Sequence, residues 1–189
     1  LAVSTEESVE GFVFYLVQYS LTNVNTFLTI LAFGYITKGI LQNNSSVREF
    51  VLLDDLKGQF YKNPLLVISF SVSLFSMAGI PPLMGFFAKQ MVLYSVSYNY
   101  SYVAILAIVM SVISASYYLK IVQLMFFQKD SAPTILSSEG ETSETGTPLI
   151  TSMHSSVIAI LTLMISLYLF DSSILLNACH LLSLSLFSS

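Results

Sequence analysis

The segment PLLVISFSVSLFSMAGIPPLMGFFAKQMVLYSVSY, residues 64–98, decides the fold that the sequence predicts. As one straight helix its roughly 35 residues would extend about 50 Å, too long for a hydrocarbon core about 30 Å thick. Pro81 and Pro82 lie in its middle, directly after Gly79 and Ile80. Proline lacks a backbone N–H and clashes with the preceding turn, so the helix must break here. We therefore expect a discontinuous helix, with one half over residues 65–80 and the other over residues 83–97.

The composition places the chain in a membrane. Its 189 residues are 54% hydrophobic and only 10% charged, with a mean hydropathy of +0.76. Soluble domains carry about 25% charged residues, so lipid must be the solvent for much of this chain. The net charge of −4 and the lack of a basic cluster argue against a nucleic-acid partner. The chain opens Leu1-Ala2-Val3 without a signal peptide, and we expect it to be the later part of something longer.

Four stretches are long and apolar enough to span a bilayer: residues 12–36, 64–98, 102–127 and 151–170. The sequence thus predicts an all-α integral membrane helical bundle with about four transmembrane spans, one of them discontinuous. Residues 1–128 form its transmembrane region, and residues 129–150 form a polar acidic loop. Residues 151–189 supply a C-terminal transmembrane helix and a tail, 174–187, that is too short to cross and is expected at the interface.

The basic residues predict the orientation of these spans. With Lys89 set aside, alternation puts every cation on one side of the membrane, which the positive-inside rule makes the cytoplasm or the mitochondrial matrix. These cations are Lys38, Arg48, Lys57, Lys62, Lys120 and Lys129. Both ends of the chain should lie on the opposite side.

Lys89 is a lone cation within a hydrophobic span, where a charged side chain is unfavourable. An ammonium near the centre of a bilayer costs about 3 kcal/mol. A lysine near a helix end can snorkel to the headgroups, but Lys89 lies near neither end of the second half-helix. Intramembrane ionisable groups usually mark ion paths, and burial disfavours the charged form of a lysine. We therefore expect Lys89 to take up and release a proton beside the broken backbone.

Other polar residues point less strongly to a site. Tyr117 and Tyr118 are typical interfacial aromatics, although their hydroxyls could order water near the path. Polar side chains of the first span, Gln18, Asn23 and Asn25, favour interhelical hydrogen bonding. The single cysteine, and two histidines without ligands at suitable spacing, predict neither a disulfide nor a metal site. No residue is expected to be catalytic.

Two stretches carry a resemblance to a known family. SMAGIPPLMGFFAK, residues 76–89, resembles the motif S-x-A-G-I-P-P-x-x-G-F-x-x-K of the antiporter-like proton-pumping subunits of respiratory complex I. SASYYLK, residues 114–120, follows at the usual distance, and the match runs from about residue 12 to residue 127. The family has fourteen transmembrane helices in two inverted repeats, each with one broken helix. This chain resembles the last four.

The resemblance implies roles for particular residues. Lys89 matches the buried lysine that closes the proton path of the second repeat, and Gly79, Pro81 and Pro82 match the break. The family's early glutamate, and its lysines in the first broken helix and the next helix, have no counterpart here. Those parts must lie in missing sequence or in another chain.

The resemblance also implies a function. The chain would be a subunit of the H⁺-translocating NADH:ubiquinone reductase, coupling NADH-to-ubiquinone electron transfer to proton pumping through a buried lysine relay. NADH, flavin, iron–sulfur clusters and ubiquinone would be handled by other subunits, consistent with the absence of cysteine motifs and glycine-rich phosphate loops. Its partners would be lipid, neighbouring antiporter-like subunits and other membrane-arm subunits, and the missing N-terminal part of this subunit. Its location would be the mitochondrial inner membrane rather than a bacterial plasma membrane.

Two alternatives stay open. A multisubunit sodium/proton antiporter shares the broken helix and the lysine, although the Pro-Pro and Tyr-Tyr-Leu-Lys forms favour complex I. A purely structural membrane subunit would scaffold an assembly without a proton path of its own.

Overall fold

The computed structural model describes residues 6–41, 56–97, 100–127, 152–168 and 173–187, and every regular element in these ranges is a helix. The helices are α1 (Glu6–Leu41), α2 (Gln59–Lys62), α3 (Pro64–Ala78), α4 (Met84–Ser97), α5 (Ser101–Phe127), α6 (Ser152–Leu167) and α7 (Ser173–Phe187). The short helix α2 was not expected from the sequence. It follows Gly58, whose left-handed backbone (φ 66°) turns the chain into it.

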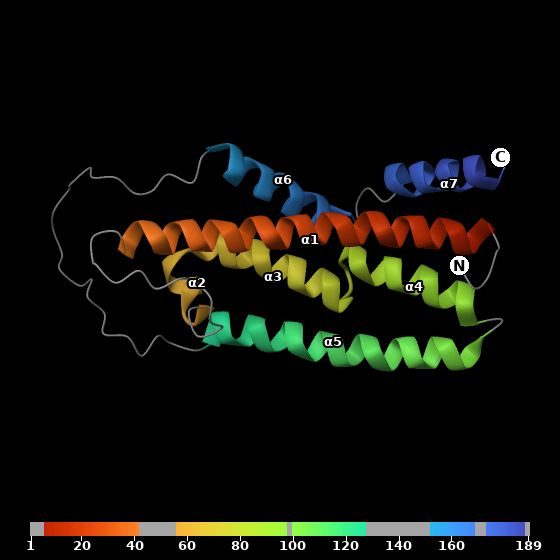
Figure 1. Ribbon diagram of the computed structural model, residues 1–189, viewed down its shortest axis with the longest axis horizontal. Coiled ribbons are helices and arrows are strands. Elements are labelled where there is room, and N and C mark those ends of the chain that lie inside the picture. The colour runs from red at the N-terminus through yellow and green to blue at the C-terminus, as the bar shows by residue number, and fades with distance from the viewer. Residues whose placement is uncertain (1–5, 42–55, 98–99, 128–151, 169–172, 188–189) are drawn as a thin grey trace.

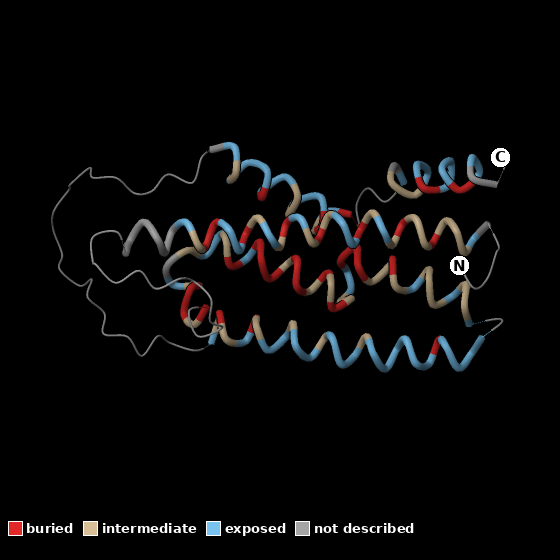
Figure 2. Tube along the Cα trace, in the orientation of Figure 1, coloured by how far each residue is buried: buried red, intermediate tan, exposed pale blue. Residues whose placement is uncertain are grey.

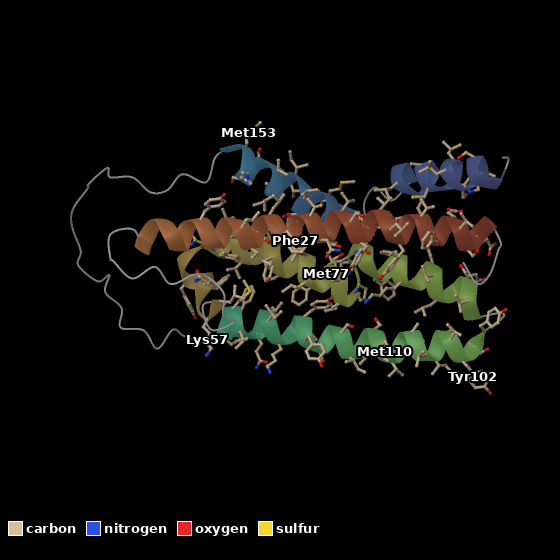
Figure 3. All side chains as sticks on the ribbon, viewed as in Figure 1. Phe27, Lys57, Met77, Tyr102, Met110 and Met153 are labelled. Atoms are coloured by element: carbon tan, nitrogen blue, oxygen red, sulfur yellow. The ribbon has the colours of Figure 1, made fainter. Side chains whose placement is uncertain are left out.

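The long helix α1 runs through the middle of the bundle. It packs against α3, α4, α6 and α7, and α6 also packs against α3. α5 packs on the side of α3 and α4 that faces away from α1 (Figure 1). The chain ends of α1 and α7 lie at the same end of the bundle, beside Tyr102, and Lys57 lies at the opposite end (Figures 1 and 3). Lys57 thus lies at the end where the sequence predicts the cations (Figure 3), whereas the orientation of the bundle in a membrane stays a prediction.

The discontinuous helix is confirmed, with its break where the prolines stand. α3 ends at Ala78, and Gly79 follows in the left-handed conformation (φ 84°, ψ 38°). Ile80 N–H donates to the Phe75 carbonyl (3.1 Å) and Gly79 N–H to the Ser76 carbonyl (3.1 Å). This is the Schellman arrangement, which ends a helix by turning two N–H groups back onto its last turn. The Pro81–Pro82 peptide bond is cis, and α4 begins two residues later.

The two halves of the broken helix meet closely at Gly85. Its N–H donates to Ser76 Oγ (3.2 Å), and a Cβ added to it would overlap the Ser76 backbone carbonyl. Only a residue without a side chain allows this approach. The first turn of α4 is therefore held against the last turn of α3, instead of diverging from it.

Most buried residues lie in the part of the bundle around α1 and α3 (Figure 2). The buried residues gather where α1, α3 and α4 face one another, whereas α5 is exposed along most of its length (Figure 2). Among the described helices, α5 alone is both long and apolar enough to cross a membrane by itself; α3, α6 and α7 contain shorter apolar stretches. An apolar helix with so much exposed surface needs lipid or further protein as its solvent.

The C-terminal helices α6 and α7 follow one another along α1 (Figure 1). Tyr168, just after α6, is 5% exposed, with its ring centroid 5.5 Å from that of Phe14 and 5.8 Å from that of Phe87. Cys179 of α7 is buried in the same cluster. The end of α6 and the start of α7 therefore pack at the depth where α4 begins.

Some expectations fall outside these observations. The polar acidic loop, 129–150, lies outside the described residues, and so do the region boundaries at its two ends. The interfacial position of residues 174–187 stays a prediction, because the helix contacts do not define a membrane surface.

Candidate functional site

The Lys89 side chain turns back from α4 toward the break. Its ammonium Nζ donates to the Met77 carbonyl (2.8 Å) and the Ala78 carbonyl (3.1 Å), and to Ser111 Oγ on α5 (2.9 Å). The residue is half-buried. A snorkelling lysine would extend along its helix toward the headgroups, whereas this one reaches toward the middle of the bundle.

The break supplies the acceptors that this ammonium needs. The last carbonyls of a helix have no partner within the helix, and the Schellman turn claims only those of Phe75 and Ser76. The carbonyls of Met77 and Ala78 therefore remain available to Lys89. The negative end of the α3 dipole also favours a cation there. Gly79 lies beside the lysine, and a Cβ on it would come within 3.0 Å of Lys89 Cδ.

Three hydrogen bonds match the three donors of a protonated lysine. A neutral amine has two N–H donors and one lone pair, so after loss of the proton it keeps all three contacts only if the Ser111 hydroxyl turns to donate to it. The two carbonyls belong to α3 and the hydroxyl belongs to α5. A change in the charge of Lys89 therefore changes how α4 is held to its neighbours.

Two pockets meet at Lys89. The inner pocket, about 310 Å³, is lined on α1 by Tyr15, Gln18 and Tyr19 and on α5 by Ser111, Ser114 and Tyr118. The outer pocket, about 490 Å³, extends along α4 and α5 from Gly79 to Tyr94 and Ser97. Lys89 and Ser111 line both pockets. The Lys89 side chain thus lies where the two pockets meet.

The predicted site residues are only partly brought together. Lys89 and Gly79 are in contact, whereas Pro81 and Pro82 are exposed and shape the break from outside. The tyrosine pair is split, because Tyr118 lines the inner pocket while Tyr117 is 65% exposed. The role of either hydroxyl in ordering water stays a prediction.

Sequence reasoning missed Ser111 and did not connect Gln18 with the lysine. Ser111 is one of many hydroxyl residues in an apolar helix, and nothing in its neighbours distinguishes it. Gln18 was assigned to interhelical hydrogen bonding, and its Nε2 does donate to Ser76 Oγ on α3 (3.3 Å). It also lines the inner pocket, which only the folded chain shows.

Within the described part of the chain, no three His, Cys, Asp or Glu residues gather. His180 Nδ1 instead lies 3.2 Å from Glu10 Oε2 and joins α7 to α1. This contact is largely exposed on the histidine side, and we assign it a role in packing.

Residues 1–114 match the family model described as NADH:quinone oxidoreductase/Mrp antiporter, transmembrane region. The chain belongs to this family. Its fold is found again in a chain of respiratory complex I from Thermus thermophilus solved with bound aureothin (TM-score 0.60, 24% identity, 88% of this chain and 34% of that chain).

The curated relatives of the chain are named as subunits of NADH–quinone oxidoreductases. NADH-ubiquinone oxidoreductase chain 2 of Rhizopus oryzae is 45% identical over 99% of this chain, and that of Metridium senile is 36% identical over 69%. NADH-quinone oxidoreductase subunit N of Hydrogenovibrio crunogenus is 41% identical over 61%. The present chain spans only 38%, 31% and 22% of the length of these relatives.

Proposed function

We propose that this chain forms the last part of a proton-translocating membrane-arm subunit of respiratory complex I, and that Lys89 is its proton-exchanging group. The observation that carries the proposal is the position of the Lys89 ammonium. It is held by two helix-end carbonyls and one hydroxyl, at the meeting point of two pockets. The names of the three relatives, all NADH–quinone oxidoreductase subunits, support the assignment to complex I.

In this proposal the chain carries no redox chemistry of its own. Electron transfer from NADH to ubiquinone, with its flavin and iron–sulfur clusters, takes place in other subunits and changes the charge near Lys89. Protonated Lys89 donates to all three partners, whereas neutral Lys89 donates to two of them and must accept from Ser111 to keep the third. Proton uptake and release thereby change how α4 is bonded to α3 and α5. The exposed face of α5 would be covered by lipid or by neighbouring membrane-arm subunits.

The proposed location is the mitochondrial inner membrane. The match to the fungal relative covers 99% of this chain at 45% identity, whereas the match to a bacterial relative covers 61% of this chain at 41% identity. A subunit of a sodium/proton antiporter is the second candidate, because the family description covers both classes of protein. Sodium dependence of transport by the purified assembly would favour that candidate.

The test is Lys89→Met in the assembled complex, in sealed membranes. A positioned proton-transfer group contributes about 10²–10⁴-fold to the rate of its step, so we expect proton transport through this subunit to fall at least about tenfold. Proton uptake by the vesicles and NADH oxidation with an uncoupler are measured on the same preparation.

Lys120→Met is the matched control, because Lys120 is an exposed lysine toward the far end of α5. It should pump like the unaltered complex. If Lys89→Met pumped fully, with electron transfer still coupled, the chain would be a structural subunit.

A further inference from the structure

A line of buried polar side chains runs between α1, α3 and α6, away from Lys89. On α1, Gln18, Thr22 and Asn25 recur at helical spacing and are 3%, 0% and 0% exposed. Facing them on α3 are Ser69, Ser73 and Ser76, and on α6 Thr162; these seven residues are the polar seam. Burying so many polar groups in a membrane bundle is costly unless they are paired.

The seam is almost, but not completely, paired. Asn25 Nδ2 lies 2.8 Å from Ser73 Oγ, 3.3 Å from Thr162 Oγ1 and 3.4 Å from Ser69 Oγ. Ser69 and Thr162 also share a hydrogen bond of 2.6 Å. Asn25 Oδ1 is buried, and no donor among the described residues reaches it. Exchanging the amide nitrogen and oxygen would change which atom is unpaired, but one would still lack a partner.

Both ends of the seam open into hollows of the molecule. Gln18 lines the inner pocket that contains Lys89. At the other end, Ser69 and Thr162 line a groove of about 560 Å³ between α3 and α6, which reaches Asn63 at the start of α3. From Ser76 to Ser69 the seam extends about 10 Å along α3, toward the end of the bundle where Lys57 lies (Figure 3).

We propose that the seam carries protons from the Lys57 end of the bundle to the Lys89 pocket through its hydroxyl groups and bound water. Interhelical hydrogen bonding alone explains the paired groups, but it does not explain a buried amide atom without a partner. Leaving such an atom unpaired costs about 1–3 kcal/mol, and an ordered water with about three partners relieves this cost. Asn25 is therefore a water-binding side chain at the centre of the seam. The inference rests on the proposed role of Lys89 as the receiving group.

The transfer needs no other reagent. Each hop forms an O–H bond on the receiving oxygen and breaks one on the donating oxygen, which then accepts the next proton. Serine and threonine hydroxyls and water can both donate and accept, as this requires. The last hop forms the third N–H bond of neutral Lys89, and the ammonium then donates to all three of its partners.

The test uses two pairs of variants in the assembled complex in sealed membranes. Asn25→Leu removes the water-binding amide, with Asn23→Leu as its control, because Asn23 is half-buried on another face of α1. Ser73→Ala removes a hydroxyl of the seam, with Ser71→Ala as its control. Ser71 is also buried, and among the described residues it bonds only its own helix, at the Val67 carbonyl (2.7 Å). Pumping is expressed per assembled complex.

We expect Asn25→Leu to lower proton transport about tenfold, as for loss of a proton-transfer group, and Ser73→Ala to lower it less; both controls should pump normally. Full pumping by Asn25→Leu and Ser73→Ala, with at most a lower yield of complex, would show that the seam only joins the helices. If Lys89→Met also pumped fully, the proposed function itself would fail; if Lys89→Met alone stopped pumping, only the seam would be excluded.

A structural measurement covers the case in which Asn25→Leu does not assemble. A map of the unaltered complex that resolves ordered water should show a water within hydrogen-bond distance of the Asn25 amide and of a seam hydroxyl. A map that resolves water elsewhere in the bundle and none at Asn25 would overturn the inference, whatever the variants do.

Discussion

The polar seam and the Lys89 site lie next to each other, but their polar groups find hydrogen-bond acceptors in different ways. In the seam, neutral hydroxyls are satisfied along intact helix: Thr22 Oγ1 donates to the Gln18 carbonyl (2.9 Å) and Ser73 Oγ to the Ser69 carbonyl (3.2 Å). A hydroxyl can share a carbonyl that is already bonded. A charged ammonium needs stronger acceptors, and Lys89 donates to the Met77 and Ala78 carbonyls, which accept no backbone N–H of their own helix.

This difference in acceptors explains why the broken helix and the lysine occur together. Unclaimed carbonyls exist only where a helix ends, and inside a bilayer a helix can end only where another group pairs them. The Met77 and Ala78 carbonyls need a donor, and the Lys89 ammonium needs acceptors. The break and the cation therefore stabilise each other, whereas the seam requires no break.

Gly85→Ala should have the largest effect, because Gly85 joins the two regions through Ser76. The new methyl group would overlap the Ser76 backbone carbonyl, so α3 and α4 must move apart. Overpacking of this kind costs about 1–3 kcal/mol. We expect a clear loss of assembled complex on native gels and a lower midpoint of thermal unfolding.

Gly34→Ala is the control for that substitution. It lies in α1, and a Cβ there would meet no atom within 4 Å. Alanine in a helix interior is about 0.5–1 kcal/mol more favourable than glycine, so stability should be unchanged or slightly raised. Equal yields for Gly85→Ala and Gly34→Ala would contradict the close approach of the two half-helices.

Ser111→Ala separates the Lys89 site from the seam, because it removes one contact of the ammonium and none of the seam. A hydrogen bond contributes about 0.5–1.5 kcal/mol, and water in the pockets can replace part of it. We expect proton transport to fall about threefold to fivefold, less than for Lys89→Met, with assembly unchanged. Ser116→Ala is the control, because Ser116 is exposed and bonds the Ile113 carbonyl of its own helix (2.6 Å). Pumping by Ser111→Ala that equals the control would show that this contact does not hold the lysine.

The sequence predicts the break and the isolated lysine, but it does not predict which residues Lys89 meets. The break at Gly79 and the isolated Lys89 are local features, since proline, glycine and charge act on their own neighbours. The hydroxyl that Lys89 meets on α5 depends on how helices rotate against one another. Hydrophobic periodicity does not define this rotation in helices that are apolar on nearly every side.

The tyrosine pair shows the same limit at the scale of one residue. Adjacent positions on a helix point about 100° apart, and of Tyr117 and Tyr118 only Tyr118 lines the inner pocket. Tyr118 also packs against the buried core around Phe70 and Met125. The order of the two tyrosines in the sequence does not predict which of them lines the pocket.

Tyr118→Phe should have the smallest effect of the series and tests that choice directly. The substitution keeps the ring and its packing and removes only a hydroxyl at the wall of the inner pocket. Because water can take the place of that hydroxyl, we expect proton transport to fall by no more than about twofold. Tyr117→Phe alters an exposed ring and should change nothing. Proton uptake by sealed vesicles, normalised to uncoupled NADH oxidation, compares the two. An effect of Tyr117→Phe larger than that of Tyr118→Phe would mean that the face of α5 in contact with the proton path is not the one that lines the Lys89 pocket, and the assignment of Ser111 would fail with it.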